Sequence, residues 1–197
     1  MPSWRSALRG RIKRCPPQNP KVVLLGVGQE FGGDDGAGLE VVRRLLRRID
    51  DPGMWRIIDG GIAPENYAGW IAAWDPALVI VIDAAEMGAP PGCIRLLDWE
   101  RAAGLSASTH TLPLTLLGRY LTLACGCDLA LLGVQVGDSS VISSGASKDG
   151  ARFGADLSPE VAAAAAEIVD ALAEILTAAA VLGGEKESDV HVSNDYL

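Results

Sequence analysis

The side chains of this sequence that are best suited to chemistry follow its apolar runs. Asp34 and Asp35 lie in a glycine-rich loop after the first such run, and Asp83 ends the most continuous one. His110, one of 2 histidines, stands just before a helical pattern. Two carboxylates and one imidazole are a ligand set that transition metals accept, with coordination positions left open for water or substrate. Asp35, Asp83 and His110 are therefore candidate metal ligands.

The same residues allow other roles. Asp35 and Asp83 could share a proton over an attacking water, as the two carboxylates of an aspartic protease do. Purely structural roles are a third interpretation, in which Asp34 or Asp35 caps the following helix and Asp83 caps a turn. His110 could then be a hydrogen-bonded histidine at a helix start. Ligands from three separate loops leave no local spacing, so the residue types alone do not decide among these roles.

Short apolar runs predict the strands that would position these residues. The runs are Val22–Leu25, Trp55–Ile58, Leu78–Ile82, Cys93–Leu97 and Leu129–Gln135. The letters LVIVI of Leu78–Ile82 are typical of a central parallel strand, buried on both faces. Cys93–Leu97 follows a rigid GAPPG turn, and we expect it to be an edge hairpin partner of Leu78–Ile82.

Helical patterns alternate with most of these strands. They begin near Asp35, Pro64, Ser108 and Ser158. The alternation predicts a single-domain α/β fold, a doubly wound, mostly parallel twisted sheet of about five strands with helices on both faces. In such sheets the first and third strands are commonly neighbours, and ligands bind at the carboxyl ends of the strands. The loops that carry Asp35 and Asp83 are expected to meet there.

A nucleotide-binding α/β module is the weaker alternative for this loop. Gly26 and Gly28 follow a strand as in a dinucleotide-binding turn, and Asp59 resembles the acid that binds a ribose. However, Phe31 occupies the place of the third glycine. The aspartate pair would also repel a pyrophosphate at the helix start. Neither a GxSxG serine elbow nor a phosphate-binding P-loop occurs in the sequence.

Charge and composition limit the partners and the location. The formal net charge of -8 argues against a nucleic-acid or anionic-membrane partner. Residues 1–20 are basic without a following apolar segment, so we expect a poorly ordered extension rather than a signal peptide. A folded domain over 21–183 and a disordered tail over 184–197 complete the expected organisation. Acidic residues along one side of Ala162–Leu182 indicate a surface helix, so no membrane insertion and a cytoplasmic location are expected. The 4 cysteines lack zinc-site spacing and are expected to be free thiols.

Short motifs in a fixed order make the chain similar to the hydrogenase maturation endopeptidases. The matching segments are Gly26–Gly28, Gly32–Gly38, Asp59–Asn66, Val81–Gly88, Pro91–Arg95, Thr109–Leu114 and Leu132–Gln135. They extend over roughly residues 21–180, so the domain over 21–183 would be the peptidase domain. This family processes the large subunit of nickel–iron hydrogenases at its C-terminus. The chain most resembles the branch that serves hydrogenase 3 of the formate hydrogenlyase type.

The resemblance implies roles for particular residues. Asp35, Asp83 and His110 match the family residues that bind a metal ion, and they would sense nickel already inserted in the immature large subunit. The protease would cut the large subunit just after that subunit's own metal-binding C-terminal motif and release a short peptide. Asp35, Asp83 and His110 would also be the catalytic candidates. The stretch Asp59-Gly60-Gly61 would help to bind the substrate. One departure is Gln29, where the family usually has asparagine.

The implied partner is the precursor of a nickel–iron hydrogenase large subunit. The only implied cofactor is the nickel of that substrate, and the enzyme is expected to be a monomer. A non-catalytic, metal-sensing chaperone of hydrogenase precursors is the alternative from another functional class. The retention of Asp35, Asp83 and His110 disfavours a loss of activity.

Overall fold

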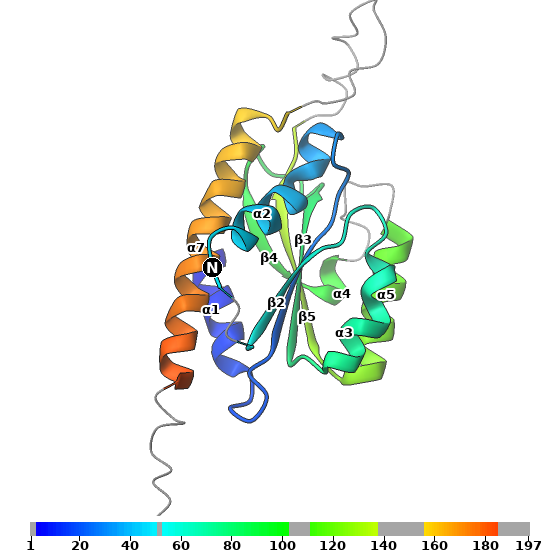
Figure 1. Ribbon diagram of the computed structural model, residues 1–197. Coiled ribbons are helices and arrows are strands. Elements are labelled where there is room, and N and C mark those ends of the chain that lie inside the picture. The colour runs from blue at the N-terminus through cyan, green and yellow to red at the C-terminus, as the bar shows by residue number, and fades with distance from the viewer. Residues whose placement is uncertain (1–2, 51–52, 103–110, 138–155, 185–197) are drawn as a thin grey trace, which may run out of the picture.

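The computed structural model describes residues 3–50, 53–102, 111–137 and 156–184. Its centre is a sheet of strands in the order β2-β1-β3-β5-β4 (Figure 1). The strands are β1 (Val22–Gly26), β2 (Trp55–Asp59), β3 (Leu78–Ala85), β4 (Ile94–Asp98) and β5 (Asp128–Gln135). All neighbouring pairs are parallel except β4 with β5. The expected doubly wound α/β fold is confirmed.

Helices cover both faces of the sheet (Figure 1). One face carries α1 (Trp4–Arg14), α2 (Ala37–Leu46) and α7 (Pro159–Gly184), and the other carries α3 (Ala68–Trp74), α4 (Trp99–Ala102) and α5 (Thr111–Cys125). Two short 3-10 turns, η1 (Gly33–Gly36) and η2 (Pro64–Tyr67), lead directly into α2 and α3. The expected first helix therefore begins as a 3-10 turn that contains both aspartates of the glycine-rich loop.

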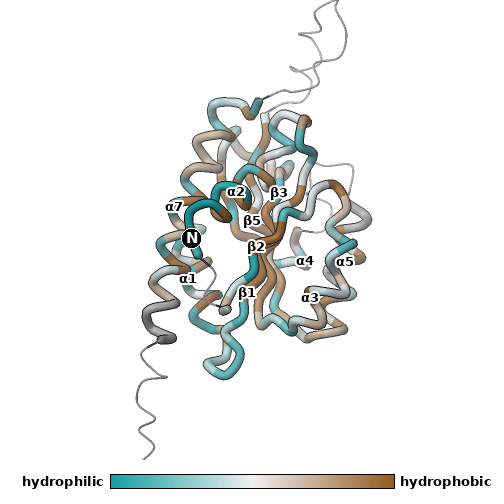
Figure 2. Tube along the Cα trace, viewed as in Figure 1, coloured by the Kyte–Doolittle hydropathy of each residue, from teal (hydrophilic) through white to brown (hydrophobic). Residues whose placement is uncertain are grey.

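Each central strand divides its side chains between two cores. Val22 and Leu24 of β1 pack with α2 and α7, whereas Val23 and Leu25 pack with α3 and α5. This division follows from the two-residue period of a strand. Figure 2 shows the resulting apolar strands enclosed between the helical layers. Because β1 and β3 are buried along their whole length, they can only be central strands.

The partner expected for the fourth strand is wrong. β4 does lie at the edge of the sheet, but it pairs antiparallel with β5 rather than with β3. The register places Leu96 opposite Leu132. Both edges of β3 are already occupied by the parallel strands β1 and β5, so the chain after the turn reaches the outer edge of β5 instead.

The N-terminal segment also differs from the expectation. Instead of a poorly ordered extension, residues Trp4–Arg14 form α1, with the Ser3 hydroxyl accepting a hydrogen bond from the Ser6 amide. Leu8 is fully buried in the core that α2 and α7 share with the sheet, and Trp4 and Ile12 pack beside it. These three residues are four positions apart, which is helical spacing. The basic composition of the segment concealed that apolar stripe.

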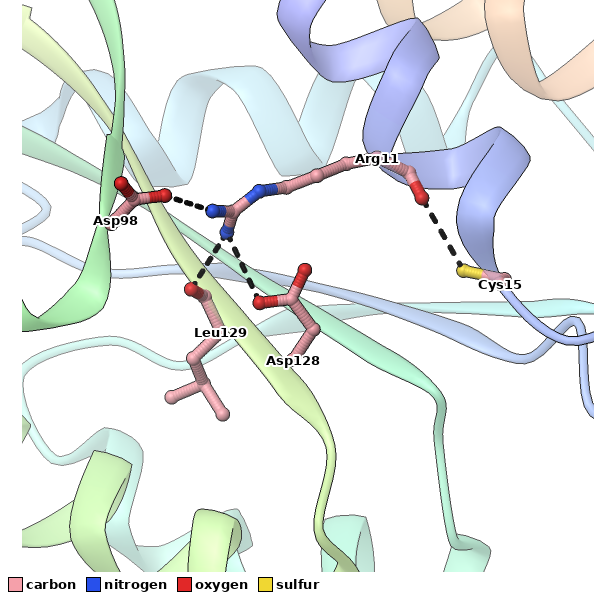
Figure 3. Close-up of polar contacts among 5 residues, drawn as sticks. All are labelled: Arg11, Cys15, Asp98, Asp128 and Leu129. Atoms are coloured by element: carbon pink, nitrogen blue, oxygen red, sulfur yellow. Dashed lines mark hydrogen bonds and ion pairs between the residues drawn. The ribbon is translucent and has the colours of Figure 1, made fainter.

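Arg11 fastens α1 to the amino end of β5 (Figure 3). Its guanidinium donates to the Leu129 carbonyl at 2.8 Å, pairs with Asp98, and lies 3.3 Å from an oxygen of Asp128. The Cys15 thiol donates back to the Arg11 carbonyl. The helix is therefore held by both apolar and ionic contacts.

The C-terminal helix α7 runs along the outside of the sheet. It extends to Gly184, the first residue of the expected tail over 184–197. The rest of that tail lies outside the described residues. No helix in the described part of the chain has the length and apolar character needed to cross a membrane. The predicted boundaries of the peptidase domain, residues 21–183, stay a prediction. Helix α1 precedes residue 21 in the sequence but packs into the core of that domain.

Candidate active site

Glycines let the loop after β1 fold tightly against its neighbours. A Cβ on Gly28, whose φ is +143°, would lie 2.0 Å from the Asp35 carbonyl oxygen. A Cβ on Gly38 would lie 2.1 Å from the Ile82 carbonyl oxygen and 2.4 Å from that of Val27. No side chain fits at such distances, so the start of α2 rests directly on the carboxyl ends of β1 and β3. In this way the loop brings the aspartates to the edge where doubly wound folds bind ligands.

Asp35 lies within η1 and is half-buried. Its carboxylate accepts a hydrogen bond from the Gln29 amide at 3.1 Å, and the Gly32 amide donates to the Gln29 carbonyl at 3.0 Å. The loop thus folds back on itself around Asp35. A backbone amide that donates to a carboxylate forms a charge-assisted hydrogen bond, so this contact fixes the orientation of the Asp35 side chain.

Asp83 comes from the neighbouring strand. The sequence placed it after the strand, but β3 continues through Ala85 and Asp83 lies within it, opposite Gly133 of β5. Its side chain is fully buried. Burial of a carboxylate is costly unless it is paired, hydrogen-bonded or bound to a cation, which indicates a specific role for Asp83. The turn η1, which carries Asp35, packs against β3.

The stretch Asp59-Gly60-Gly61 lies beside β1 on its other side. The Gly60 amide donates to the Gly26 carbonyl at 2.8 Å, and the Gly28 amide donates to the Gly61 carbonyl at 3.1 Å. The two glycine segments are therefore joined into one double-stranded rim at the carboxyl edge. Gly61, with a φ of +57° and nothing near its Cβ position, leaves open space at this rim.

Arg43 of α2 holds this rim from outside. Its guanidinium pairs with Asp59 at 2.6 Å and with Glu30 at 2.9 Å. The hydrogen bond to Asp59 raises the pKa of Arg43 above its ordinary value. Local spacing around Arg43 does not indicate this bridge, because Asp59 lies 16 positions away in the sequence. The pairing of Arg43 with Asp59 becomes visible only once the fold places α2 beside the end of β2.

Asp34 connects the loop to distant parts of the chain. It is buried, and its carboxylate accepts hydrogen bonds from the Ser158 amide at 2.7 Å, the Ser158 hydroxyl at 3.0 Å and the Gly137 amide at 3.4 Å. The sequence allowed Asp34 to cap the following helix, but α2 has no side-chain cap, and the Asp34 carboxylate binds groups far along the chain instead. Ser158, which immediately precedes α7, donates to Asp34 through both its amide and its hydroxyl.

Gln135 is a buried polar residue whose contacts were not anticipated. Its side-chain carbonyl accepts from the amides of Met87 and Ala89, at 2.6 and 3.2 Å. Its side-chain amide donates to Glu86 at 3.1 Å and to the Val136 carbonyl at 3.0 Å. Gln135 thereby holds the turn between β3 and β4. A glutamine that ends an otherwise apolar strand was the available sequence signal.

The third predicted ligand, His110, lies outside the described residues. The helix that follows it, α5, packs against η2 and α3. Within the described ranges, no group of three or more His, Cys, Asp or Glu side chains is placed to hold a metal ion. The structure therefore brings the elements of Asp35, Asp83 and Asp59 to one edge of the sheet, while the complete ligand set stays a prediction.

Comparison with known proteins gives one consistent result. Residues 39–175 match the family described as HycI, hydrogenase maturation protease. The hydrogenase 3 maturation protease of Escherichia coli K12 is 38% identical over 114 residues, which cover 57% of this chain and 71% of that protein.

Solved structures agree with this match. The crystal structure of the NiFe hydrogenase maturation protease HycI from Thermococcus kodakarensis KOD1 superposes with a TM-score of 0.69 and 29% identity, covering 87% of this chain and 99% of that one. The solution structure of the endopeptidase HycI from Escherichia coli gives a TM-score of 0.60 at 30% identity, covering 76% and 87%. The chain therefore belongs to the HycI family of hydrogenase maturation proteases.

Proposed function

We propose that this protease cuts the large-subunit precursor of a nickel–iron hydrogenase only after nickel has been inserted, with Asp35, Asp83 and His110 binding that nickel. The family reaction, cleavage of the large subunit at its C-terminus, is the starting point. The observation that supports nickel recognition best is the packing of η1, with Asp35, against β3, with the fully buried Asp83. Two carboxylates at one edge of the sheet, one from η1 and one from β3, suit a divalent cation.

The proposed chemistry makes cleavage conditional on metal loading. Two carboxylates and an imidazole can join a metal whose other ligands come from the substrate, so a precursor without nickel would lack the contact that positions it. The metal would hold the peptide near Asp35, Asp83 and His110, which are the proposed catalytic residues. The enzyme would act as a cytoplasmic monomer, once on each hydrogenase molecule.

The stretch Asp59-Gly60-Gly61 is the proposed site for the substrate backbone. Its two glycines carry no side chains that could obstruct an extended peptide, and hydrogen bonds to β1 keep the rim in place. The bridge from Arg43 fixes the Asp59 carboxylate. A preorganised rim of this kind lowers the entropy cost of binding a flexible C-terminal segment.

The proposal is tested with purified precursor in nickel-loaded and nickel-free forms. Release of the C-terminal peptide, followed by mass spectrometry, is expected from the loaded form alone. The variants Asp35→Asn, Asp83→Asn and His110→Ala are each expected to lower the rate at least about a hundredfold, since a lost charged ligand commonly costs several kcal/mol. Circular dichroism checks that each variant folds.

A matched control is Glu40→Gln, which also converts a carboxylate to an amide. Glu40 lies on α2 but pairs with Arg44 on the surface, so this variant should cut at the wild-type rate. Equal cutting of both precursor forms would remove nickel sensing from the proposal. Wild-type turnover by a folded Asp83→Asn variant would remove Asp83 from the site.

A further inference from the structure

Asp34 is the acid of the loop that the proposed nickel site does not use. It immediately precedes Asp35 within η1, yet it is buried while Asp35 is half-buried. The two carboxylates therefore lie in different surroundings, although one turn holds both. Asp35 faces the amide of its own loop, and Asp34 faces donors from elsewhere in the fold.

The three donors to Asp34 come from two remote elements. The Gly137 amide, just after β5, is 103 positions away in sequence, and the amide and hydroxyl of Ser158, just before α7, are 124 positions away. The Ser158 amide donates to one carboxylate oxygen of Asp34, and the Ser158 hydroxyl and the Gly137 amide donate to the other. Both oxygens of Asp34 therefore act as acceptors. Hydrogen bonds to a charged acceptor are the stronger kind.

We propose that Asp34 is a positioning residue, which fixes the orientation of Asp35 by anchoring η1 to the end of β5 and the start of α7. The inference rests on the proposed role of Asp35 in binding the substrate's nickel. η1 has only a single turn, so its own hydrogen bonds determine its position weakly. Its contacts with β3 fix one side of the turn, and the Asp34 anchor fixes the other.

The Gln29 amide supplies a direct readout of this effect. Because it donates to the Asp35 carboxylate, its hydrogen-exchange rate and its NMR chemical shift report whether Asp35 is held in place. In Asp34→Asn the side-chain NH2 group replaces an acceptor oxygen, and although the Ser158 hydroxyl can turn to accept from it, the backbone amides of Gly137 and Ser158 can only donate. We expect the Gln29 amide to shift and to exchange at least about tenfold faster, as for the loss of one charge-assisted hydrogen bond.

Processing should change in parallel. For the nickel-loaded precursor, kcat/KM of Asp34→Asn is expected to fall about tenfold to a hundredfold. Ser158→Ala removes one of the three donors and is expected to give a smaller loss of the same kind, whereas Ser158→Thr keeps the hydroxyl and should stay near the wild type. Ser158→Ala also serves as the test if Asp34→Asn fails to fold.

Arg11→Ala is the matched control, since it weakens the fold at the opposite end of the sheet. It should leave the Gln29 signal and kcat/KM unchanged. Folded Asp34→Asn and Ser158→Ala variants with a wild-type Gln29 signal and wild-type kcat/KM would overturn the inference. Failure of the wild type to cut the loaded precursor would instead overturn the proposed function, and the Gln29 measurement would still test the anchor.

Discussion

The carboxylates at the two ends of the sheet have different kinds of partners. At the amino end, Asp98 and Asp128 share the guanidinium of Arg11, which cancels charge (Figure 3). At the carboxyl end, Asp34 and Asp35 accept hydrogen bonds from neutral amides and a hydroxyl. Ion pairs thus join elements at the amino end, whereas hydrogen bonds from backbone amides and the Ser158 hydroxyl orient Asp34 and Asp35 at the carboxyl end.

Asp59 is an instructive intermediate case. It lies at the carboxyl end, but Arg43 neutralises it as Arg11 neutralises the acids of the amino end. Its strand, β2, is the edge strand of the sheet, one position away from β1. Asp59 is therefore held by an ion pair, whereas the donors to Asp34 are the amides of Gly137 and Ser158 and the Ser158 hydroxyl.

The largest effect is expected from adding a single methyl group at the carboxyl end. Gly38→Ala would place a Cβ against the backbone oxygens of Ile82 and Val27, which cannot move without separating α2 from the sheet. We expect a loss of about 3 kcal/mol or more in the free energy of unfolding, at the upper end of overpacking effects. Denaturant titration followed by circular dichroism measures it.

Gly69→Ala is the matched control for this substitution. Gly69 is also the second residue of its helix, α3, but nothing lies within 4 Å of its Cβ position. Alanine is the better helix former, so this variant should be unchanged or more stable by up to about 1 kcal/mol. Equal stability of the Gly38→Ala and Gly69→Ala variants would contradict the close packing of α2 on the strand ends.

A smaller effect is expected at the amino end. Arg11→Ala would leave the Leu129 carbonyl without its donor and should lower the free energy of unfolding by about 1–2 kcal/mol. Arg5→Ala on the same helix breaks an ion pair with Glu167 that is exposed on both sides, so it should cost only about 0–1 kcal/mol. A loss of processing in Arg11→Ala beyond its loss of folded protein would contradict the separation of the two ends.

The smallest effect concerns a thiol at the amino end and depends on pH. Burial, followed by its hydrogen bond to Cys125, raises the pKa of Cys127 above the ordinary thiol value. The folded protein therefore keeps this proton while the unfolded chain loses it from about pH 8.5 upward. Stability should be unaffected below that pH and should fall as the pH rises above it.

The measurement compares the wild type with Cys127→Ala at pH 7 and pH 9.5. The difference in unfolding free energy between the two proteins should shrink at the higher pH, by about 1.4 kcal/mol at most. The comparison cancels other groups that titrate in the same range. A difference that stays constant would show that the folded thiol titrates like an unfolded one.

The apolar runs of the sequence predicted the strands and the class of the fold. The expected strands agree with β1 to β5 to within a few residues, because a continuous apolar run such as Leu78–Ile82 has only one favourable environment. The neighbouring positions of β1 and β3, and with them the meeting of the Asp35 and Asp83 elements at one edge, followed from the usual strand order of doubly wound sheets.

Features that depend on distant contacts were not predictable. The partner of β4 is set by which sheet edge is free, and α1 is stabilised by ion pairs with Glu167 and Glu174, which lie far along the chain. The same limit applies to the site. Nothing near Asp34 in sequence indicates Gly137 or Ser158, and the full set with His110 stays a prediction.

The anchor on Asp34 also orders events during synthesis. The acidic turn leaves the ribosome early, but its amide and hydroxyl partners at Ser158 belong to the last quarter of the chain. Elements made first must therefore wait for α7 before the turn is fixed, whatever folds in the meantime. If Asp34 positions Asp35 as proposed, the acidic turn takes its working position only after Ser158 and α7 have been synthesised.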